Sequence, residues 1–360
     1  MSIVECRKEL ENFAKQKPKA CKVVVLPDFF LDRLINIDWN PQEFSDLVGD
    51  VAKRKGGSID GVPQTDMKGG NATNVASALA RLGAKATPIV CTSKWGLQQM
   101  KYYFKGTGVG TSHVKALGKV SVTTALEFKN KDAKTNVMLR DLGALADFGP
   151  DDLDESDFAA LGEADYVCLF NWAGTLKNGT QLAQIVFGKT RKLGKAKTYY
   201  DTADPTPNIG ATPDLMELVL KSNLIDILSV NENEAVVYAR LLDAGFIDGK
   251  AYLPFAELAM EAARVLARYL RARIDLHTTA FSATLRGKTE VVAPTFRVNV
   301  LRATGAGDAW TAGNLVGDNS GLSDLCRLTL ANAVAACYLS EPEGRHPTLK
   351  NLLSFLKNYT

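Results

Sequence analysis

Short apolar runs rich in β-branched residues alternate with longer amphipathic stretches along most of the chain. Continuous apolar runs are typical of strands covered on both faces, and alternation of strands with helices predicts a parallel sheet with crossover helices. The runs predicted as strands cover residues 22–26, 87–91, 164–170, 196–201, 225–230 and part of 274–284. The stretches predicted as helices cover residues 1–22, 71–82, 98–105, 177–193, 213–222, 233–243, 255–272 and 322–339. We therefore expect an α/β fold.

A different pattern interrupts this alternation. Residues 120–128 alternate between polar and apolar positions, with Val120, Val122, Leu126 and Phe128 on one face. A polar turn and a second run at 135–140 complete a predicted hairpin. Residues 33–66 contain prolines and glycines and lack a helical period, which favours short strands and loops over a packed helix. A half-exposed sheet between buried strands predicts a lid or an oligomer face, because its apolar side must cover something.

Composition excludes several classes of protein. The 360 residues are 46% hydrophobic and 23% charged, which is ordinary for a globular chain, and the net charge of +3 indicates no nucleic-acid partner. No window approaches the ~18 apolar residues of a membrane span, and the first residues lack the apolar core of a signal peptide. Cys91, Cys168 and Cys337 lie in apolar runs, which predicts buried thiols, and the scattered histidines predict no metal cluster. We expect a cytoplasmic protein.

The stretch from Thr304 to Asp308 carries the strongest chemical signal. Gly305, Ala306 and Gly307 form a small-residue turn before a predicted helix. Free N–H groups at a helix start bind anions, and the helix dipole favours negative charge there. A carboxylate beside such a turn suits phosphoryl transfer to a hydroxyl, because one group takes the proton while the amides stabilise the developing charge. The alternative is that Asp308 only caps the helix.

Two segments nearer the N-terminus could contribute to the same site. Gly69 and Gly70 open a predicted helix whose first turns contain Asn74, so their amides and the Asn74 side chain would face the edge of the sheet. Asp28 and Asp32 follow the first buried strand, where open α/β sheets bind ligands. The alternatives are a tight turn with close helix packing for the glycines and ordinary turn acids for the aspartates.

Asn231 and Glu234 are three residues apart at a predicted helix start after another buried strand. At this spacing both could face a hydrated Mg²⁺, which prefers oxygen ligands and keeps its waters. They could equally form a reciprocal helix cap.

Taken together, these three segments and their order resemble the ribokinase-like carbohydrate kinases, the PfkB family. The resemblance implies a three-layer α/β/α sandwich with a central, mostly parallel sheet and a small β-sheet lid. It assigns residues 1–32, 67–115 and 145–360 to the large nucleotide- and substrate-binding domain, and residues 33–66 and 116–144 to the lid.

The resemblance also implies transfer of the terminal phosphoryl group of a nucleotide to a hydroxyl of a sugar or related polyol, with Mg²⁺. ATP is the expected donor, and ADP stays possible. Asp308 would be the base and Gly305, Ala306 and Gly307 the anion hole. The acceptor would contact Asp32, Gly69, Gly70, Asn74 and Arg140. The nucleotide and Mg²⁺–phosphate side would use Thr304, Asn231, Glu234 and Asn332, with Mg²⁺ held through water near Glu234.

Two departures from the family pattern leave alternatives open. Arg302 stands where the family often has the aspartate of a monovalent-cation loop, and residues 276–283 lack the glycines of its nucleotide loop. Arg140 could bind a substrate phosphate or hydroxyl, or be a solvated or ion-paired arginine. The alternative functions are a nucleoside kinase, a sugar-phosphate kinase with ATP or ADP as its donor, and a non-catalytic sugar or nucleotide sensor. The apolar face of the lid makes a homodimer plausible.

Overall fold

The computed structural model describes residues 3–15, 20–129, 134–250, 252–301 and 304–358. Its centre is an eight-stranded sheet in the order β14-β13-β12-β11-β10-β9-β1-β4. The strands from β4 to β12 run parallel, and β13 and β14 add an antiparallel edge. Their bounds are β1 Lys22–Leu26, β4 Lys85–Pro88, β9 Tyr166–Phe170, β10 Lys197–Asp201, β11 Ile227–Val230, β12 Arg273–His277, β13 Phe281–Arg286 and β14 Thr289–Pro294. The predicted α/β class and mostly parallel sheet are confirmed.

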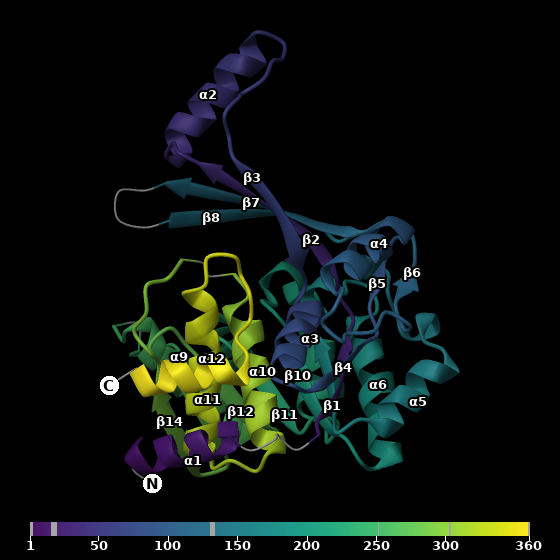
Figure 1. The fold of residues 1–360 in the computed structure, drawn as a ribbon, viewed down its shortest axis with the longest axis vertical. Coiled ribbons are helices and arrows are strands. Elements are labelled where there is room, and N and C mark those ends of the chain that lie inside the picture. The colour runs from purple at the N-terminus through teal and green to yellow at the C-terminus, as the bar shows by residue number, and fades with distance from the viewer. Residues whose placement is uncertain (1–2, 16–19, 130–133, 251, 302–303, 359–360) are drawn as a thin grey trace.

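Helices cover both faces of this sheet (Figure 1). Alternate residues of β1 show the two faces, because Val23 and Val25 belong to one core cluster while Val24 and Leu26 belong to the other. The first cluster is covered by α1 Ile3–Lys15, α3 Asn71–Arg81, α4 Lys94–Tyr103, α10 Ala306–Asn319, α11 Asp324–Leu339 and α12 Leu349–Asn358. The second is covered by α5 Glu155–Glu163, α6 Gly179–Leu193, α7 Thr212–Leu215, α8 Glu232–Leu242 and α9 Phe255–Tyr269. The fold is a three-layer sandwich.

The predicted strand at 87–91 is divided. Its first half lies in β4, whereas Cys91–Thr92 forms β5, which pairs with β6 (Lys115–Ala116) in a separate two-stranded sheet. Gly96 on α4 packs against the Thr92 side chain at this point.

A four-stranded sheet rises beyond the body as a lid (Figure 1). Its order is β3-β2-β7-β8, with bounds β2 Phe30–Ile37, β3 Gln64–Gly69, β7 Ser121–Lys129 and β8 Lys134–Asp141. The predicted hairpin is confirmed as the antiparallel pair β7–β8. The lid strands extend a few residues beyond the predicted 33–66 segment, so Asp32 and Gly69 lie on the lid itself.

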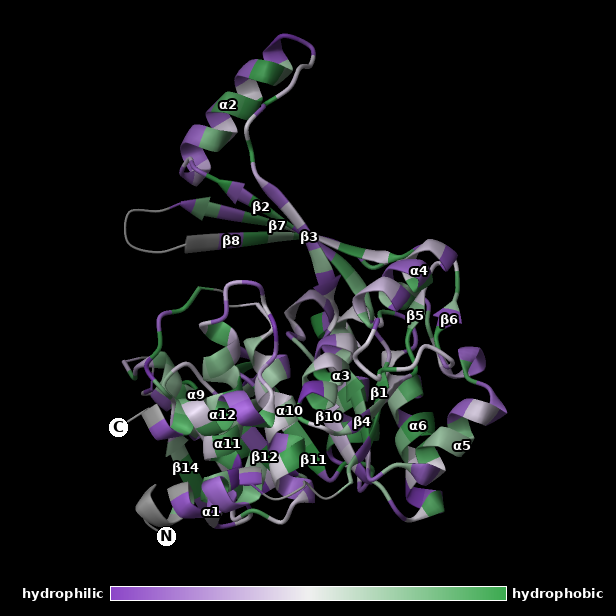
Figure 2. Cartoon of the chain, viewed as in Figure 1, coloured by the Kyte–Doolittle hydropathy of each residue, from purple (hydrophilic) through white to green (hydrophobic). Residues whose placement is uncertain are grey.

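The prediction of only strands and loops for residues 33–66 is wrong. Helix α2 (Pro41–Lys53) stands at the outer end of the lid (Figures 1 and 2). It begins with a capping box in which Asn40 and Glu43 satisfy each other's backbone N–H groups, and Pro41 occupies the first helical turn. None of its residues is buried, so no core-facing stripe marked it in the sequence.

The alternation of β7 is confirmed, and the predicted apolar face is buried in part, because Val120 and Phe128 are buried but Val122 and Leu126 are not. Ser121, Thr123 and Ala125 are buried, whereas Val122 and Leu126 are only half-buried. The face with Ser121, Thr123 and Ala125 is small and mostly polar, and its Thr123 lies beside Asp32 of β2.

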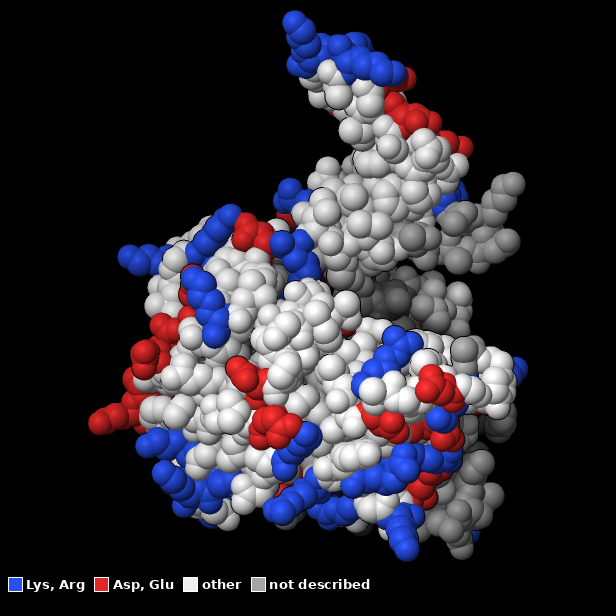
Figure 3. All heavy atoms as spheres, turned by 180° about the vertical axis from the view of Figure 1, so that it is seen from behind, with Lys and Arg blue, Asp and Glu red and all other residues white. Residues whose placement is uncertain are grey.

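Surface features agree with the composition. Both signs of charge are scattered over the body, and Lys and Arg gather at the free end of α2 (Figure 3). Among the described residues, no helix combines the length and the hydropathy needed to cross a bilayer. The thiols of Cys91 and Cys168 are buried and free, as predicted, and Cys337 is free and partly exposed.

Candidate active site

The turn before α10 combines a left-handed glycine with a helix start. Gly305 has a φ of 88°, and a β-carbon there would lie 2.7 Å from the hydroxyl of Tyr338. Tyr338 donates this hydroxyl to the carbonyl oxygen of Thr304 at 3.0 Å, which fastens the turn to α11. The N–H groups of a first helical turn have no acceptor within the helix, and the dipole favours negative charge there. The predicted anion-binding turn at Gly305, Ala306 and Gly307 therefore has suitable backbone geometry.

Asp308 lies in this first turn, and only 6% of it is exposed. Asn71 donates its Nδ2–H to one carboxylate oxygen at 2.9 Å, and Asn74 donates its Nδ2–H to the other at 2.9 Å. Both asparagines lie on one face of α3, which packs beside α10. The structure thus brings Asn74 and Asp308 together from segments 234 residues apart.

Lys68 fixes the orientation of one of these amides. Its ammonium lies 3.0 Å from Oδ1 of Asn74. Because an ammonium can only donate, the Asn74 oxygen faces Lys68 and its nitrogen faces Asp308. The sequence interpretation missed both Lys68 and Asn71. Their positions in the sequence could have indicated them, because Lys68 immediately precedes the pair Gly69–Gly70. Asn71 immediately follows this pair, three residues before Asn74.

Asp28 holds the start of α3. It is fully buried and accepts from the backbone N–H groups of Asn71 at 3.0 Å and Ala72 at 2.8 Å, and from the Asn171 amide at 2.9 Å. Gly70 has a φ of 94°, and a β-carbon there would lie 3.0 Å from the carbonyl oxygen of Asp28. Asp28 is thus committed to the fold rather than to a ligand, and Gly70 permits the close approach.

The lid contributes a second carboxylate, that of Asp32. Register places Asp32 beside Thr123, and Thr123 beside Arg140, so the three side chains share one face of the lid. The Arg140 guanidinium lies 5.3 Å from the ring centroid of Phe30, two residues from Asp32 on the same face. One oxygen of Asp32 is buried without a hydrogen-bond partner among the described residues. The structure therefore groups Asp32 and Arg140 on the inner side of the lid.

Burial and mutual repulsion perturb the carboxylates at this edge. Desolvation, with the charges of Asp201 and Asp28 adding to it, raises the pKa of Asp308 to about 8, although both amide hydrogen bonds lower it. Desolvation likewise raises the pKa of Asp201 and of Asp32 to about 6. A cluster of buried acids with raised pKa values is typical of a functional site.

Asn231 and Glu234 form a reciprocal cap on α8. The Asn231 side chain accepts from the Glu234 N–H at 3.0 Å, and the Glu234 carboxylate accepts from the Asn231 backbone N–H at 2.9 Å and from its amide at 2.8 Å. Burial, with repulsion from Asp201, raises the pKa of Glu234. No group of three or more acidic, histidine or cysteine side chains among the described residues could hold a metal directly. The repulsion between Glu234 and Asp201 would suit a hydrated cation, which these carboxylates would hold through water.

The nucleotide-side prediction for Asn332 has less support. Its oxygen accepts from the indole N–H of Trp310 at 2.9 Å, and its amide donates to the carbonyl oxygens of Ala293 at 3.3 Å and Pro294 at 3.0 Å. These contacts join α10, α11 and β14, so they favour a structural role for Asn332.

The turn between β12 and β13 replaces the expected glycine loop. Thr278 accepts from the N–H groups of Ala280 and Phe281 at 3.1 and 2.9 Å, and the Thr279 N–H donates to Glu232 at 2.7 Å. The turn is therefore held by side chains rather than by glycines. Arg302, the other departure from the family pattern, lies outside the described residues.

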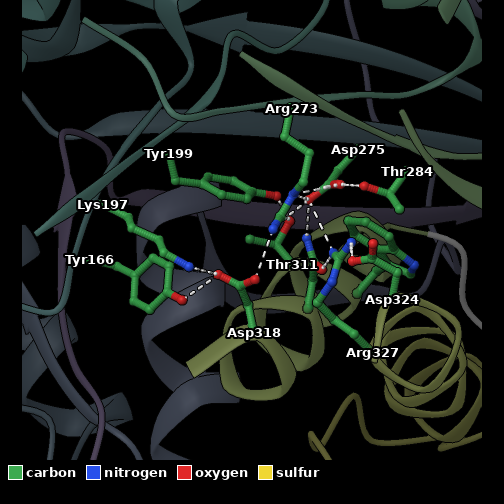
Figure 4. A network of polar contacts seen from close by, with 12 residues as sticks. Tyr166, Lys197, Tyr199, Arg273, Asp275, Thr284, Thr311, Asp318, Asp324 and Arg327 are labelled. Carbon is green, nitrogen blue, oxygen red and sulfur yellow. Dashed lines mark hydrogen bonds and ion pairs between the residues drawn. The ribbon is translucent and has the colours of Figure 1, made fainter. Parts of the chain in front are cut away.

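A buried network of charges holds α10 against the sheet below the site (Figure 4). Asp275 on β12 is fully buried and contacts Arg273 at 2.9 Å and Arg327 of α11 at 3.2 Å. Arg273 also contacts Asp318, near the end of α10, at 2.8 Å. The Asn314 amide of α10 donates to Asp275 at 2.9 Å. The far half of the helix that carries Asp308 is thereby fixed to the central sheet.

A helix-borne carboxylate beside a glycine turn, under a β-sheet lid and at the carboxyl edge of a mostly parallel sheet, defines the ribokinase-like class of α/β proteins. The sequence pattern of the pfkB family carbohydrate kinases matches residues 45–351. The chain belongs to this family, whose members are phosphotransferases.

Individual relatives agree with this assignment. The chain is 24% identical to a ribokinase from Haemophilus influenzae over 294 residues, which cover 81% of this chain and 87% of the relative. Its fold is similar to that of an adenosine kinase from Sinorhizobium meliloti, with a TM-score of 0.71, 17% identity and coverage of 95% and 100% of the two chains. It is also similar to an Arabidopsis thaliana ribokinase complexed with ribose and ATP, with a TM-score of 0.69, 19% identity and coverage of 94% and 99%.

Proposed function

We propose that the protein is a kinase that transfers the terminal phosphoryl group of ATP to a hydroxyl of a sugar or related polyol, with Asp308 as general base. The observation that carries this proposal is the position of Asp308. It is a buried carboxylate, held by two amides, that opens the same helix as the anion turn formed by Gly305, Ala306 and Gly307. A base and an anion cradle at one helix start suit attack of a hydroxyl on a phosphoryl group.

The acceptor would lie between the lid and α3. The unpaired oxygen of Asp32 can accept a hydrogen bond from a hydroxyl, and Asn74 lies beside Asp308. Gly69 and Gly70 would contact the acceptor through their backbone, since the space beside them is taken by the Asp32 carboxylate and the Asp28 backbone. Arg140 could bind a further hydroxyl or an anionic group. These contacts would place one acceptor hydroxyl against Asp308.

In the proposed step, the acceptor oxygen attacks the terminal phosphorus in line with the bond to the departing nucleotide oxygen. The oxygen–phosphorus bond forms as that bond breaks, and the acceptor proton passes to Asp308. The amides of residues 305–307 stabilise the charge on the transferred group. Thr304 begins this turn and holds it to α11 through the hydrogen bond that its carbonyl oxygen accepts from Tyr338. Asn231 and Glu234 would hold Mg²⁺ through water, and the ion would supply neutralisation of the phosphate charge.

Three alternative functions remain to be distinguished by experiment. A nucleoside acceptor is compatible with the fold similarity to the adenosine kinase. An anionic acceptor, with ATP or ADP as donor, would use Arg140. A non-catalytic sensor would keep the fold without turnover, although the arrangement of Asp308 argues against it.

A phosphoryl-transfer screen tests the proposal. Sugars, polyols, nucleosides and sugar phosphates would each be incubated with Mg²⁺ and either ATP or ADP, and the phosphorylated product would be detected by mass spectrometry. We expect a sugar or polyol to be phosphorylated by ATP. A nucleoside or sugar-phosphate product would select an alternative acceptor, and no product with any pair would favour the sensor.

A homodimer through the lid also stays a prediction. Val137 and Leu139 on β8 are 44% and 57% exposed, and both lie on the face of the lid opposite Asp32 and Arg140. Light scattering of the wild-type protein and of a Leu139→Lys variant would test it, with a monomeric variant expected.

A further inference from the structure

Asn71 contacts Asp308 in a way that the sequence interpretation did not foresee. Its side chain reaches from the first residue of α3 across to α10, and its Nδ2 lies 2.9 Å from Oδ1 of Asp308. Its backbone N–H is anchored at 3.0 Å by the fully buried Asp28. The backbone of Asn71 is therefore held by the Asp28 carboxylate, while its side-chain amide holds the Asp308 carboxylate.

The two amides that hold Asp308 differ in what else they do. Asn74 is bound to Lys68 through its oxygen, and the proposed acceptor lies beside it. An acceptor that hydrogen-bonds to Asn74 competes with the contact between Asn74 and Asp308. The contact from Asn71 fixes the opposite oxygen, so it can keep the carboxylate plane in place while Asn74 turns to the acceptor.

We infer that Asn71 is a positioning residue for Asp308, which orients the carboxylate for the hydroxyl and favours its ionised form. This inference rests on the proposed function, because it assigns a role toward the base of that reaction. The alternative is a structural link between α3 and α10 without influence on the reaction.

The electrostatic surroundings support this role. Asp308 faces Asp28 from the β1–β2 connection and Asp201 from β10, and both charges raise its pKa. The hydrogen bonds from Asn74 and Asn71 lower it, and the ammonium of Lys68 holds the oxygen of the Asn74 amide. Removing one donor from a buried carboxylate among like charges leaves the protonated form favoured over a wider pH range.

The test compares wild-type protein with Asn71→Ala and Asn71→Ser, neither of which can reach Asp308. In the acceptor assay we expect kcat to fall roughly 10- to 100-fold, the factor that corresponds to a hydrogen bond with a charged group. The acidic limb of the pH profile should move to higher pH by about one unit, while the acceptor KM changes little. An Asn74→Ala variant should change kcat and the pH profile in the same direction, because Asn74 also donates to Asp308, but it should in addition raise the acceptor KM.

A second readout does not depend on activity. Protein labelled with ¹³C at the aspartate carboxyl carbons would be titrated by NMR, with the Asp308 signal assigned by its loss in Asp308→Asn. We expect Asp308 to titrate at higher pH in both Asn71 variants than in wild-type protein. If wild-type protein transfers no phosphoryl group, the proposed function fails, but this titration still tests the link between Asn71 and Asp308.

The remaining outcomes overturn the inference. An unchanged titration and pH profile would show that Asn71 does not act on Asp308. A raised acceptor KM with unchanged kcat would make Asn71 a substrate contact. Loss of the folded state in both variants would assign the contact to the stability of the fold.

Discussion

The carboxylate of Asp32 occupies the space that a side chain at Gly69 would need. Gly69 is opposite Phe30 in the β2–β3 pair, and a β-carbon built on it would overlap the Asp32 side chain. The first glycine of the pair thus makes room for the lid carboxylate, whereas Gly70 allows the backbone to approach Asp28.

A Gly69→Ala variant should therefore displace Asp32. Because Asp32 is proposed to bind an acceptor hydroxyl, we expect the acceptor KM to rise about 10-fold or more while the donor KM stays unchanged. Gly49→Ala on α2 is the control, since nothing lies within 4 Å of a β-carbon there. Steady-state kinetics with each substrate varied would measure both. Equal effects of the two variants would contradict this role of Gly69.

The raised pKa of Asp308 predicts a dependence of activity on pH. A base must be ionised, so kcat/KM should increase as the pH rises toward about 8, the pKa of Asp308. The rate of phosphoryl transfer would be measured in buffers from about pH 6 to about pH 9. A profile that is flat across this range would contradict the pKa assigned to the base.

The same pKa predicts a dependence of stability on pH, with opposite sign. The folded protein keeps a proton on Asp308 that the unfolded chain releases above about pH 4. The unfolding free energy contributed by this group therefore falls as the pH rises from about 4 to about 8. Asp308→Asn lacks this proton, so its stability relative to wild-type protein should increase across that window. Urea denaturation of both proteins at several pH values would measure the difference.

The two left-handed glycines that flank α10 should respond differently to substitution. Alanine at Gly305 or Gly321 costs about 1–2 kcal/mol of backbone strain, since their φ values are 88° and 71°. Only Gly305→Ala also meets Tyr338 and distorts the anion turn, whereas a β-carbon at Gly321 has nothing within 4 Å. We expect both to lower the thermal midpoint, but only Gly305→Ala to lower kcat substantially. A similar loss of kcat in Gly321→Ala would contradict the anion-turn assignment.

The buried network under α10 predicts a large effect on stability. Arg327 is 1% exposed and Asp275 is 0% exposed, so Arg327→Leu would remove a cation from a buried carboxylate. Breaking a buried pair costs about 3–5 kcal/mol when the remaining charge has no partner, and Asp275 keeps Arg273, so we expect a loss at or below the lower end of this range. Arg345→Leu is the control, because the side chain is 66% exposed and its ion pairs should contribute only about 0–1 kcal/mol. Urea denaturation would compare the two, and similar midpoints would contradict a stabilising role of this network.

Much of the fold could be predicted because the buried strands leave a clear signal. A continuous apolar run such as β1 or β9 exposes apolar side chains on both faces of the strand, so both faces must be covered by other elements. Helix α2 was missed because none of its residues is buried, so its only signal was the local cap formed by Asn40 and Glu43. The burial of β7 was predicted only in part, because hydropathy marks the apolar residues such as Phe128, whereas the small face that carries Thr123 is buried as well.

The parts of the candidate site that belong to a backbone motif could be predicted from the sequence. The parts that depend on a single side chain could not. Gly305, Gly70 and Asp308 stand in recognisable turns, and the structure places them together with Asn74. Asn71 has no signature of its own, because its role depends on the packing of α3 against α10. The pairing of Asp275 with Arg327 joins residues 52 positions apart, which no local pattern could reveal.

The central claim is that Asp308 takes the proton of the acceptor hydroxyl. The direct test is single-turnover phosphoryl transfer by wild-type protein and Asp308→Asn, with acceptor and nucleotide binding measured by calorimetry. Asn71 can rotate its side chain to accept from the amide that this substitution introduces, so the fold and binding should persist. The account predicts that the rate falls by roughly 10²–10⁴ while both dissociation constants stay within a few-fold. A variant that binds both substrates and transfers the phosphoryl group at the wild-type rate would contradict it.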